Sequence, residues 1–198
     1  MIRLSAPAEW KSGDIHRAFC EETCPVPQLH GTVFRVDFLR KMGIKLLENV
    51  YYVDEQLMVW TYLRADSVCK LEFDVYRYSI GRETQSISYQ SMGLHWHDRE
   101  QVIRSCLEYQ HELNKNMTLR RHCTQQLAKN IGNHFTTLYI YVEPKGVGRK
   151  GAKKWRRFII ENAPDLWRQV EKKAWLLSIL SSIHITPMWY RKIKEILF

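Results

Sequence analysis

Two adjacent carboxylates, Asp54 and Glu55, lie in the segment LENVYYVDEQLMVW, between a pair of tyrosines and a run of large apolar residues. A carboxylate can act as a general base when a hydroxyl group lies within hydrogen-bond reach, and desolvation by aromatic neighbours raises its pKa. A structural role is also open, because an Asp just before an apolar helix can cap its free backbone N–H groups. The segment therefore predicts a general base or a helix cap at Asp54, and one side chain can serve as both.

Residues with metal-binding side chains occur in two groups: His16, Cys20 and Cys24 at spacings of four, and the HWH triplet at 95–97. A structural zinc site needs four ligands in recognisable paired spacing. The second pair is missing here, and Pro25 would break the helix that aligns the first group. We therefore predict no metal site.

The five cysteines are an odd number and are scattered along the chain, and the segment MIRLSAPAEW resembles neither a signal peptide nor a membrane span. A disulfide framework is therefore not expected, and we expect the protein to reside in a reducing compartment. The thiols are expected to behave as buried small hydrophobes.

These residues need elements to position them, and the hydrophobic pattern predicts several helices and one clear strand. A helix over 32–43 should end at Gly43, and the next should begin at Asp54. Residues 68–78 alternate between apolar and polar types and predict a strand. Asp98 and Gln101 have capping-box spacing at the start of another helix. The remaining expected elements are loops at 80–91 and 143–154, and helices continuing to about 142, over 153–162, over 164–183 and after Pro187.

The segments HGTVFRVDFLRKMG, GIKLLENVYYVD, VYRYSIGR and GRETQS, in this order over residues 29–88, resemble the acceptor-side half of family 2 glycosyltransferases. The resemblance implies an α+β fold. Residues 1–95 would form the acceptor-side part of a glycosyltransferase A-type domain with few strands, and residues 96–198 a mostly helical region with a basic amphipathic tail. One good strand cannot form a sheet with covered edges, so the rest of the sheet is expected upstream.

The resemblance implies an enzyme that transfers a single sugar, with inversion, from a nucleotide-sugar donor to a saccharide or lipid-linked acceptor in cell-surface polysaccharide or glycoconjugate synthesis. Asp54 matches the base that takes the proton from the acceptor hydroxyl. Many family members have Glu directly before this Asp, whereas this chain has Val53 there and Glu55 after it. Glu55 is therefore expected to substitute for Asp54 or to support it.

The resemblance also places Arg82, His30, Tyr52 and Gln85 among the substrate-binding residues. The planar guanidinium of Arg82 would suit the phosphates of a donor or of a lipid-pyrophosphate acceptor. From the residues alone, Arg82 is equally well a solvated loop arginine, and His30 is more readily a structural histidine.

The family's donor half contains further strands and a short acidic motif that holds a metal ion, and nothing in residues 1–28 is similar to either. An intact member would bind Mg²⁺ or Mn²⁺ together with the nucleotide sugar. For this chain alone we expect no metal cofactor and little activity without a donor-binding half. The processive-synthase motif Gln-x-x-Arg-Trp is also absent, which favours single transfer over polymerisation.

The net charge of +9 lies in the last quarter of the chain, because residues 145–198 contain 13 Lys and Arg against four acids. Tryptophans are interleaved with these cations, as in helices that lie on anionic membranes. The apolar stripe over 166–180 is more readily a face packed on the body. We therefore expect a cytoplasmic protein that is peripheral on the inner membrane face through its basic tail.

Nucleic acid is not expected as a partner, since no known nucleic-acid-binding motif accompanies the basic tail. Two alternatives to the enzyme remain: a non-catalytic interaction module, and a basic nucleic-acid-binding protein.

Overall fold

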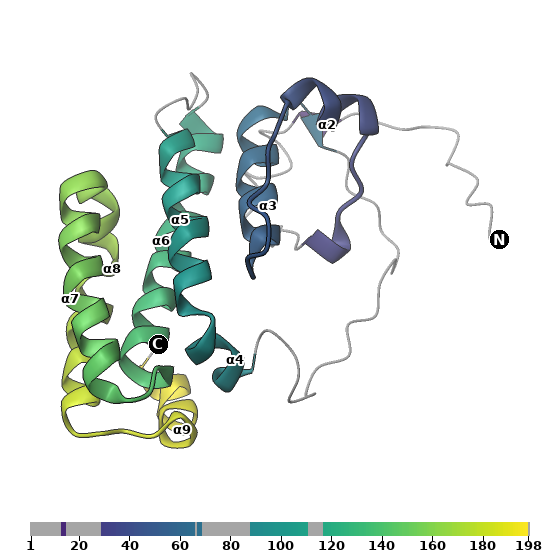
Figure 1. Ribbon diagram of the computed structural model, residues 1–198. Helices are drawn as coiled ribbons and strands as arrows, with labels where there is room; N and C mark the ends of the chain where they lie inside the picture. The colour runs from purple at the N-terminus through teal and green to yellow at the C-terminus, as the bar shows by residue number, and fades with distance from the viewer. Residues whose placement is uncertain (1–12, 15–28, 66, 69–87, 111–116, 198) are drawn as a thin grey trace.

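The computed structural model describes residues 13–14, 29–65, 67–68, 88–110 and 117–197, and most of these residues are helical (Figure 1). A 3-10 turn, η1 (Leu29–Gly31), precedes the first helix, and a π-helical turn, η2 (Thr137–Tyr141), extends α6. Strands β1 (Gly13–Asp14) and β2 (Ser67–Val68) pair antiparallel. The helices are α2 (Val36–Met42), α3 (Val53–Arg64), α4 (Tyr89–Leu94), α5 (Trp96–Gln110), α6 (Met117–Thr136), α7 (Lys145–Asn162), α8 (Pro164–Ser182) and α9 (Pro187–Leu197).

The expected α+β fold is wrong. Among the described residues, β1 and β2 are the only strands, and two strands of two residues cannot form a sheet that covers a core. The helices instead bury their apolar stripes against one another, which gives an all-α arrangement rather than part of a glycosyltransferase A-type domain. Of the strand predicted over 68–78, only Val68 lies within the described residues, where it belongs to β2.

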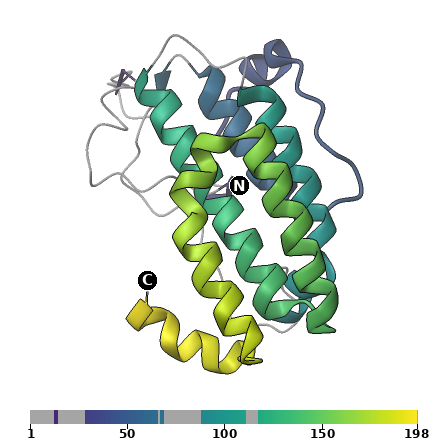
Figure 2. The ribbon, with the colours of Figure 1, turned by 90° about the vertical axis from the view of Figure 1, so that its left-hand side faces the viewer.

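The core lies between long helices. Helix α6 contacts α3, α5 and α8, and α7 packs on α8, so that α7 and α8 run side by side in Figure 2. The same core contains side chains from both sides of residue 95, where the expected two parts of the chain would meet. Burying one large aliphatic side chain contributes about 1.5–3 kcal/mol. Fully buried examples are Ile103, Leu127, Ile131, Leu138, Ile159 and Leu177.

Several predicted helix boundaries are confirmed. Helix α2 ends at Met42, and Gly43 follows it with a left-handed backbone (φ 58°), which a glycine adopts without a Cβ penalty. Helix α8 begins at Pro164, a residue that suits the first helical turn, and α9 begins at Pro187. Local signals were sufficient at these positions.

The loop predicted over 143–154 is wrong, because α7 begins at Lys145. Two of its glycines, Gly148 and Gly151, serve close packing rather than a turn. A Cβ on Gly148 would overlap the carbonyl oxygen of Leu138 in η2, whereas a Cβ on Gly146 would meet no atom within 4 Å. The backbone of α7 can therefore approach the π-helical turn only where a side chain is absent.

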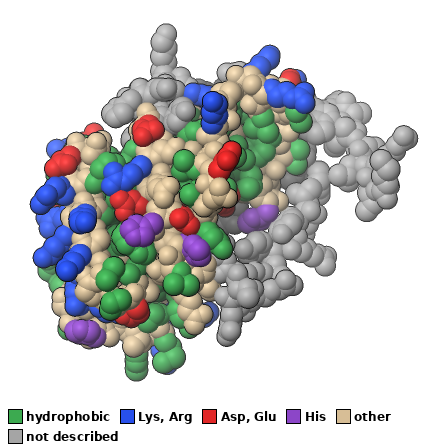
Figure 3. All heavy atoms as spheres, viewed as in Figure 1, with side chains coloured by type: hydrophobic (Ala, Val, Ile, Leu, Met, Phe, Trp, Pro, Cys, Tyr) green, Lys and Arg blue, Asp and Glu red, His purple; other side chains and the backbone are tan. Residues whose placement is uncertain are grey.

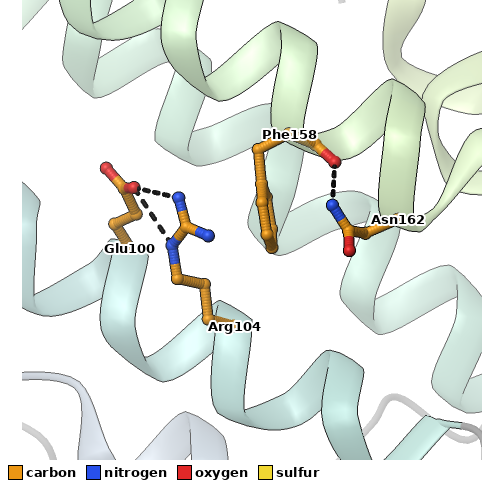
Figure 4. Close-up of polar contacts among 4 residues, drawn as sticks. All are labelled: Glu100, Arg104, Phe158 and Asn162. Carbon is orange, nitrogen blue, oxygen red and sulfur yellow. Dashed lines mark hydrogen bonds and ion pairs between the residues drawn. The ribbon is translucent and has the colours of Figure 1, made fainter.

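A cation–π contact joins α5 to α7, with hydrogen bonds inside each helix beside it (Figure 4). Glu100 accepts two hydrogen bonds from Arg104, at 2.6 and 3.1 Å, and these fix the guanidinium. The guanidinium carbon lies 3.5 Å from the ring centroid of Phe158, a cation–π distance. Asn162 donates to the Phe158 carbonyl oxygen at 2.8 Å in the last turn of α7.

One buried histidine interrupts the apolar core. His134 of α6 is fully buried, its two ring nitrogens have no hydrogen-bond partner, and the Trp155 ring meets it edge-on at 4.9 Å. Burial lowers the pKa of His134 well below its ordinary value, so the ring is neutral at pH 7. Cys106 and Cys123 are also buried and free, which confirms the prediction for these two thiols.

Candidate functional site at the start of helix α3

The connector between α2 and α3 brings two tyrosines to the first turn of α3. Tyr52 precedes the helix with a left-handed backbone (φ 67°), and Asn49 has φ 57°. For a bulky residue this conformation costs on the order of 1 kcal/mol or more, so the surroundings must hold it in place. The Tyr52 ring is buried, and the guanidinium of Arg99 on α5 lies 4.0 Å from its centroid. Backbone strain at a large side chain is common at functional sites.

Glu55 faces the same guanidinium from the first turn of α3. Arg99 Nη2 lies 3.2 Å from Glu55 Oε1, and the second carboxylate oxygen, Oε2, is buried without a hydrogen-bond partner. Burial raises the pKa of Glu55 above its ordinary value, although Arg99 acts in the opposite direction. Such a carboxyl group retains a proton more readily than a solvated one, as general acid–base groups do.

A second polar pair lies at the start of α5. Asp98 Oδ2 accepts a hydrogen bond from the Tyr51 backbone N–H at 3.3 Å and lies 3.2 Å from His95 Nδ1. The Tyr51 and His95 rings stack with their centroids 3.7 Å apart. Tyr51 is 44% exposed, so one aromatic ring of the stack is open to solvent beside the carboxylates.

A buried glutamine fixes the connector to both helices. Gln56 Oε1 accepts a hydrogen bond from the Leu47 backbone N–H at 3.0 Å, and Gln56 Nε2 donates to Ser105 Oγ at 2.7 Å. Gln56 has no exposed surface. Because a buried amide must keep its partners, this pair of bonds holds residues 47–56 in one position against α5.

Asp54 does not cap α3, so the capping prediction is wrong. The helix begins at Val53, one residue earlier than predicted, and its N-cap Tyr52 makes no side-chain cap bond. Asp54 is exposed in the first turn, where a negative charge interacts favourably with the helix dipole. The predicted capping box at Asp98 is wrong for the same reason, because α5 begins at Trp96.

The other predicted site residues have different outcomes. Tyr52 lies with Asp54 and Glu55 at the start of α3. His30 is exposed on η1, and η1 packs against α3. Arg82 and Gln85 lie outside the described residues.

Three residues that complete the junction between α3 and α5 were not predicted to lie there: His95, which directly precedes α5, and Asp98 and Arg99 in its first turn. The segment HWHDRE does bring two histidines, an aspartate and an arginine together at the start of a helix. That density of ionisable groups was a signal, but nothing in the sequence connected it with Glu55, 44 residues away from Arg99.

The junction between α3 and α5 can support proton transfer to or from a bound hydroxyl group, since it combines an exposed carboxylate, Asp54, with a partly buried one of raised pKa, Glu55. Within the described residues, no group of three or more His, Cys, Asp or Glu side chains is arranged to hold a metal ion. We therefore assign no metal ligand here. Comparisons with protein-family models, with curated proteins and with solved structures found no match.

Proposed function

We propose that the start of α3 holds a sugar acceptor for inverting glycosyl transfer, with Asp54 as the base. The nucleotide-sugar donor, and any metal ion with it, would be held by a part of the enzyme outside the described residues. The proposal rests on the exposed Asp54 carboxylate in the first turn of α3, three residues after Tyr51, whose ring stacks on that of His95. The resemblance of residues 29–88 to family 2 glycosyltransferases, which lies in the sequence motifs and does not extend to the fold, is the reason to propose sugar transfer among the reactions that a base can serve.

In the proposed reaction, Asp54 takes the proton from an acceptor hydroxyl while the hydroxyl oxygen attacks the anomeric carbon of the donor sugar. The bond from that carbon to the nucleotide diphosphate breaks, and the diphosphate leaves with the electron pair. Glu55 is a positioning residue in this scheme, because its contact with Arg99 fixes the guanidinium over Tyr52. The exposed ring of Tyr51 offers an apolar surface on which the C–H face of a sugar can lie.

Acceptor binding is the direct test with this chain. Mono- and disaccharides are titrated to about 10 mM, since enzyme substrates commonly bind between micromolar and millimolar concentrations. NMR signals of the Tyr51 and His95 rings should shift with at least one sugar, and Tyr51→Ala should weaken that binding. Tyr89→Ala removes an exposed tyrosine of α4 and is the matched control. Sugars that leave both ring signals unmoved would remove the acceptor site from the start of α3.

The catalytic role needs a second measurement, made on an enzyme that contains this segment together with its donor half. Asp54→Asn should lower the transfer rate by at least about 100-fold, the usual contribution of a general base. The acceptor affinity should change little. Asp37→Asn, which changes an exposed aspartate of α2, is the control and should transfer at the normal rate. Normal turnover by Asp54→Asn would exclude Asp54 as the base.

A further inference from the structure

Helices α8 and α9 expose large apolar side chains around the turn that joins them. Trp175 is 66% exposed, Ile183 65%, Met188 64% and Trp189 54%, and Ile179 is also exposed. We call these five residues the α8–α9 ridge. Figure 3 shows hydrophobic side chains projecting at the lower end of the molecule, where Figure 1 places α9.

The ridge is distinct from the apolar stripe that the sequence pattern predicted on α8. Residues of that stripe are buried in the core, which confirms that it packs on the body. Trp175, Ile179 and Ile183 follow one another at intervals of four and therefore share the opposite face of the helix. Helix α8 is thus apolar on two faces, and within the described residues only one of them is covered. The buried stripe comprises Leu166, Val170, Ala174, Leu177 and Leu180.

Positive charges border the ridge at both ends. Arg168 and Lys172 continue its face toward the start of α8, where Asp165 pairs with Arg168 at 3.2 Å and Glu171 is exposed nearby. On α9, Arg191 and Lys192 are exposed, and Lys192 Nζ lies 5.1 Å from the Trp189 ring centroid. Figure 3 shows Lys and Arg side chains along its left edge, the side on which Figure 1 places α7 and α8. The exposed cations of α7 are Lys150, Lys153, Lys154, Arg156 and Arg157.

We propose that the α8–α9 ridge docks on the surface of an anionic lipid bilayer. Trp175 and Trp189 would enter the headgroup region with the aliphatic side chains, while Lys192 and its neighbours meet lipid phosphates. The segment would lie on the bilayer rather than cross it, since none of the described helices has both the length and the apolarity of a membrane span.

Two other occupants fit the ridge less well. A nucleic acid would neutralise the cations but would leave Ile183 and Met188 facing water, because aliphatic side chains do not stack on bases. A second copy of the chain would bring two basic regions together, each with 13 Lys and Arg against four acids over residues 145–198. An anionic bilayer satisfies the apolar side chains and the charges at once.

Vesicle flotation of the full chain tests the proposal independently of the sugar-transfer function. The chain should float with vesicles that contain phosphatidylglycerol, should float poorly with phosphatidylcholine alone, and should be released by salt. Trp175→Ser combined with Trp189→Ser should weaken binding at least about tenfold, because buried apolar area drives interfacial binding. Arg191→Glu combined with Lys192→Glu should weaken it by about the same factor.

The matched control changes exposed aliphatic residues at the other end of the molecule. Val33 is 80% exposed and Val36, on α2, 58%, so Val33→Ser with Val36→Ser should float like the unaltered chain. Absence of flotation, or flotation that the ridge variants leave unchanged, would overturn the proposal. So would a ridge-dependent dimer in sedimentation, which would assign the ridge to a second copy. Salt-sensitive oligonucleotide binding without vesicle binding would assign the basic surface to nucleic acid.

Discussion

The α6–α8 bundle and the α3–α5 junction are held together in different ways. In the bundle, apolar side chains such as Leu127, Ile131 and Leu177 have no exposed surface. At the α3–α5 junction, the partly buried ion pair of Glu55 and Arg99 lies beside Tyr52, which has a strained left-handed backbone. Each apolar contact in the bundle stabilises the fold. At the junction, the desolvated charges and the strained backbone of Tyr52 each cost free energy that an apolar interface would not.

This difference indicates that the α6–α8 bundle serves stability, whereas the α3–α5 junction serves a function such as ligand binding. The Glu55–Arg99 pair is partly removed from water, and ion pairs removed from water can often be replaced by apolar residues without loss of stability, so its presence needs another reason. The Glu55–Arg99 pair holds a guanidinium over Tyr52, and Asp54, the residue before Glu55, is exposed. We therefore expect substitutions in the bundle to change the free energy of unfolding. Substitutions at the junction should instead change how stability depends on pH, and should change ligand binding.

The largest expected effect is in the bundle. Gly148→Ala places a methyl group against the Leu138 carbonyl oxygen, which is backbone and cannot move aside cheaply. We expect the free energy of unfolding, measured by urea titration, to fall by at least about 3 kcal/mol. Gly146→Ala is the matched control on the same helix, where open space should allow a gain of up to about 1 kcal/mol from helix propensity. Equal effects of the two changes would contradict the close approach of α7 to η2.

A smaller, pH-dependent effect is expected at the junction. Arg99→Met leaves the partly buried Glu55 carboxylate without its cation. Because the pKa of Glu55 is already raised in the folded state, its contribution to stability is greatest below the ordinary value of 4.5 and is lost as the pH rises through the folded pKa. Without Arg99 this loss should deepen. The variant should resemble the unaltered chain near pH 4 and be less stable by about 2 kcal/mol at pH 8.

An exposed ion pair provides the control for this change. Arg35 pairs with Asp37 beside α2 while its side chain is 83% exposed, so Arg35→Met should leave stability unchanged at both pH values. A loss for Arg99→Met that is constant with pH would mean that only packing against Tyr52 was removed. In that case Glu55 would not titrate as its burial indicates.

The same two regions differ in how much the sequence revealed. The stop at Gly43 and the buried face of α8 follow from residues within one or two turns, and both were predicted. The contact between Glu55 and Arg99 joins residues 44 positions apart, and no local pattern encodes it. Asp54 and Glu55 were singled out by residue type, but their arginine partner was not.

The glycines of α7 show a different reason for failure. Gly146, Gly148 and Gly151 resemble turn residues in the sequence, and residues 143–154 were predicted as a loop. Glycine permits a turn and also permits close approach of two backbones. Which of these applies depends on the partner, here Leu138 in η2, and a partner is visible only after folding.

The smallest expected effect concerns Asp54 and separates its two possible roles. Because Asp54 is exposed and α3 has no side-chain cap, Asp54→Ala should change the free energy of unfolding by no more than about 0.5 kcal/mol, through a weak, salt-screened interaction with the helix dipole. Ser88 is a true cap, since its Oγ accepts a hydrogen bond from the Ser91 backbone N–H at 3.2 Å. Ser88→Ala should therefore cost about 1 kcal/mol. If urea titration instead gives Asp54→Ala the larger loss, the carboxylate has a structural role that its exposed position does not reveal. A near-neutral result would leave proton transfer as the better reason for an aspartate at this position.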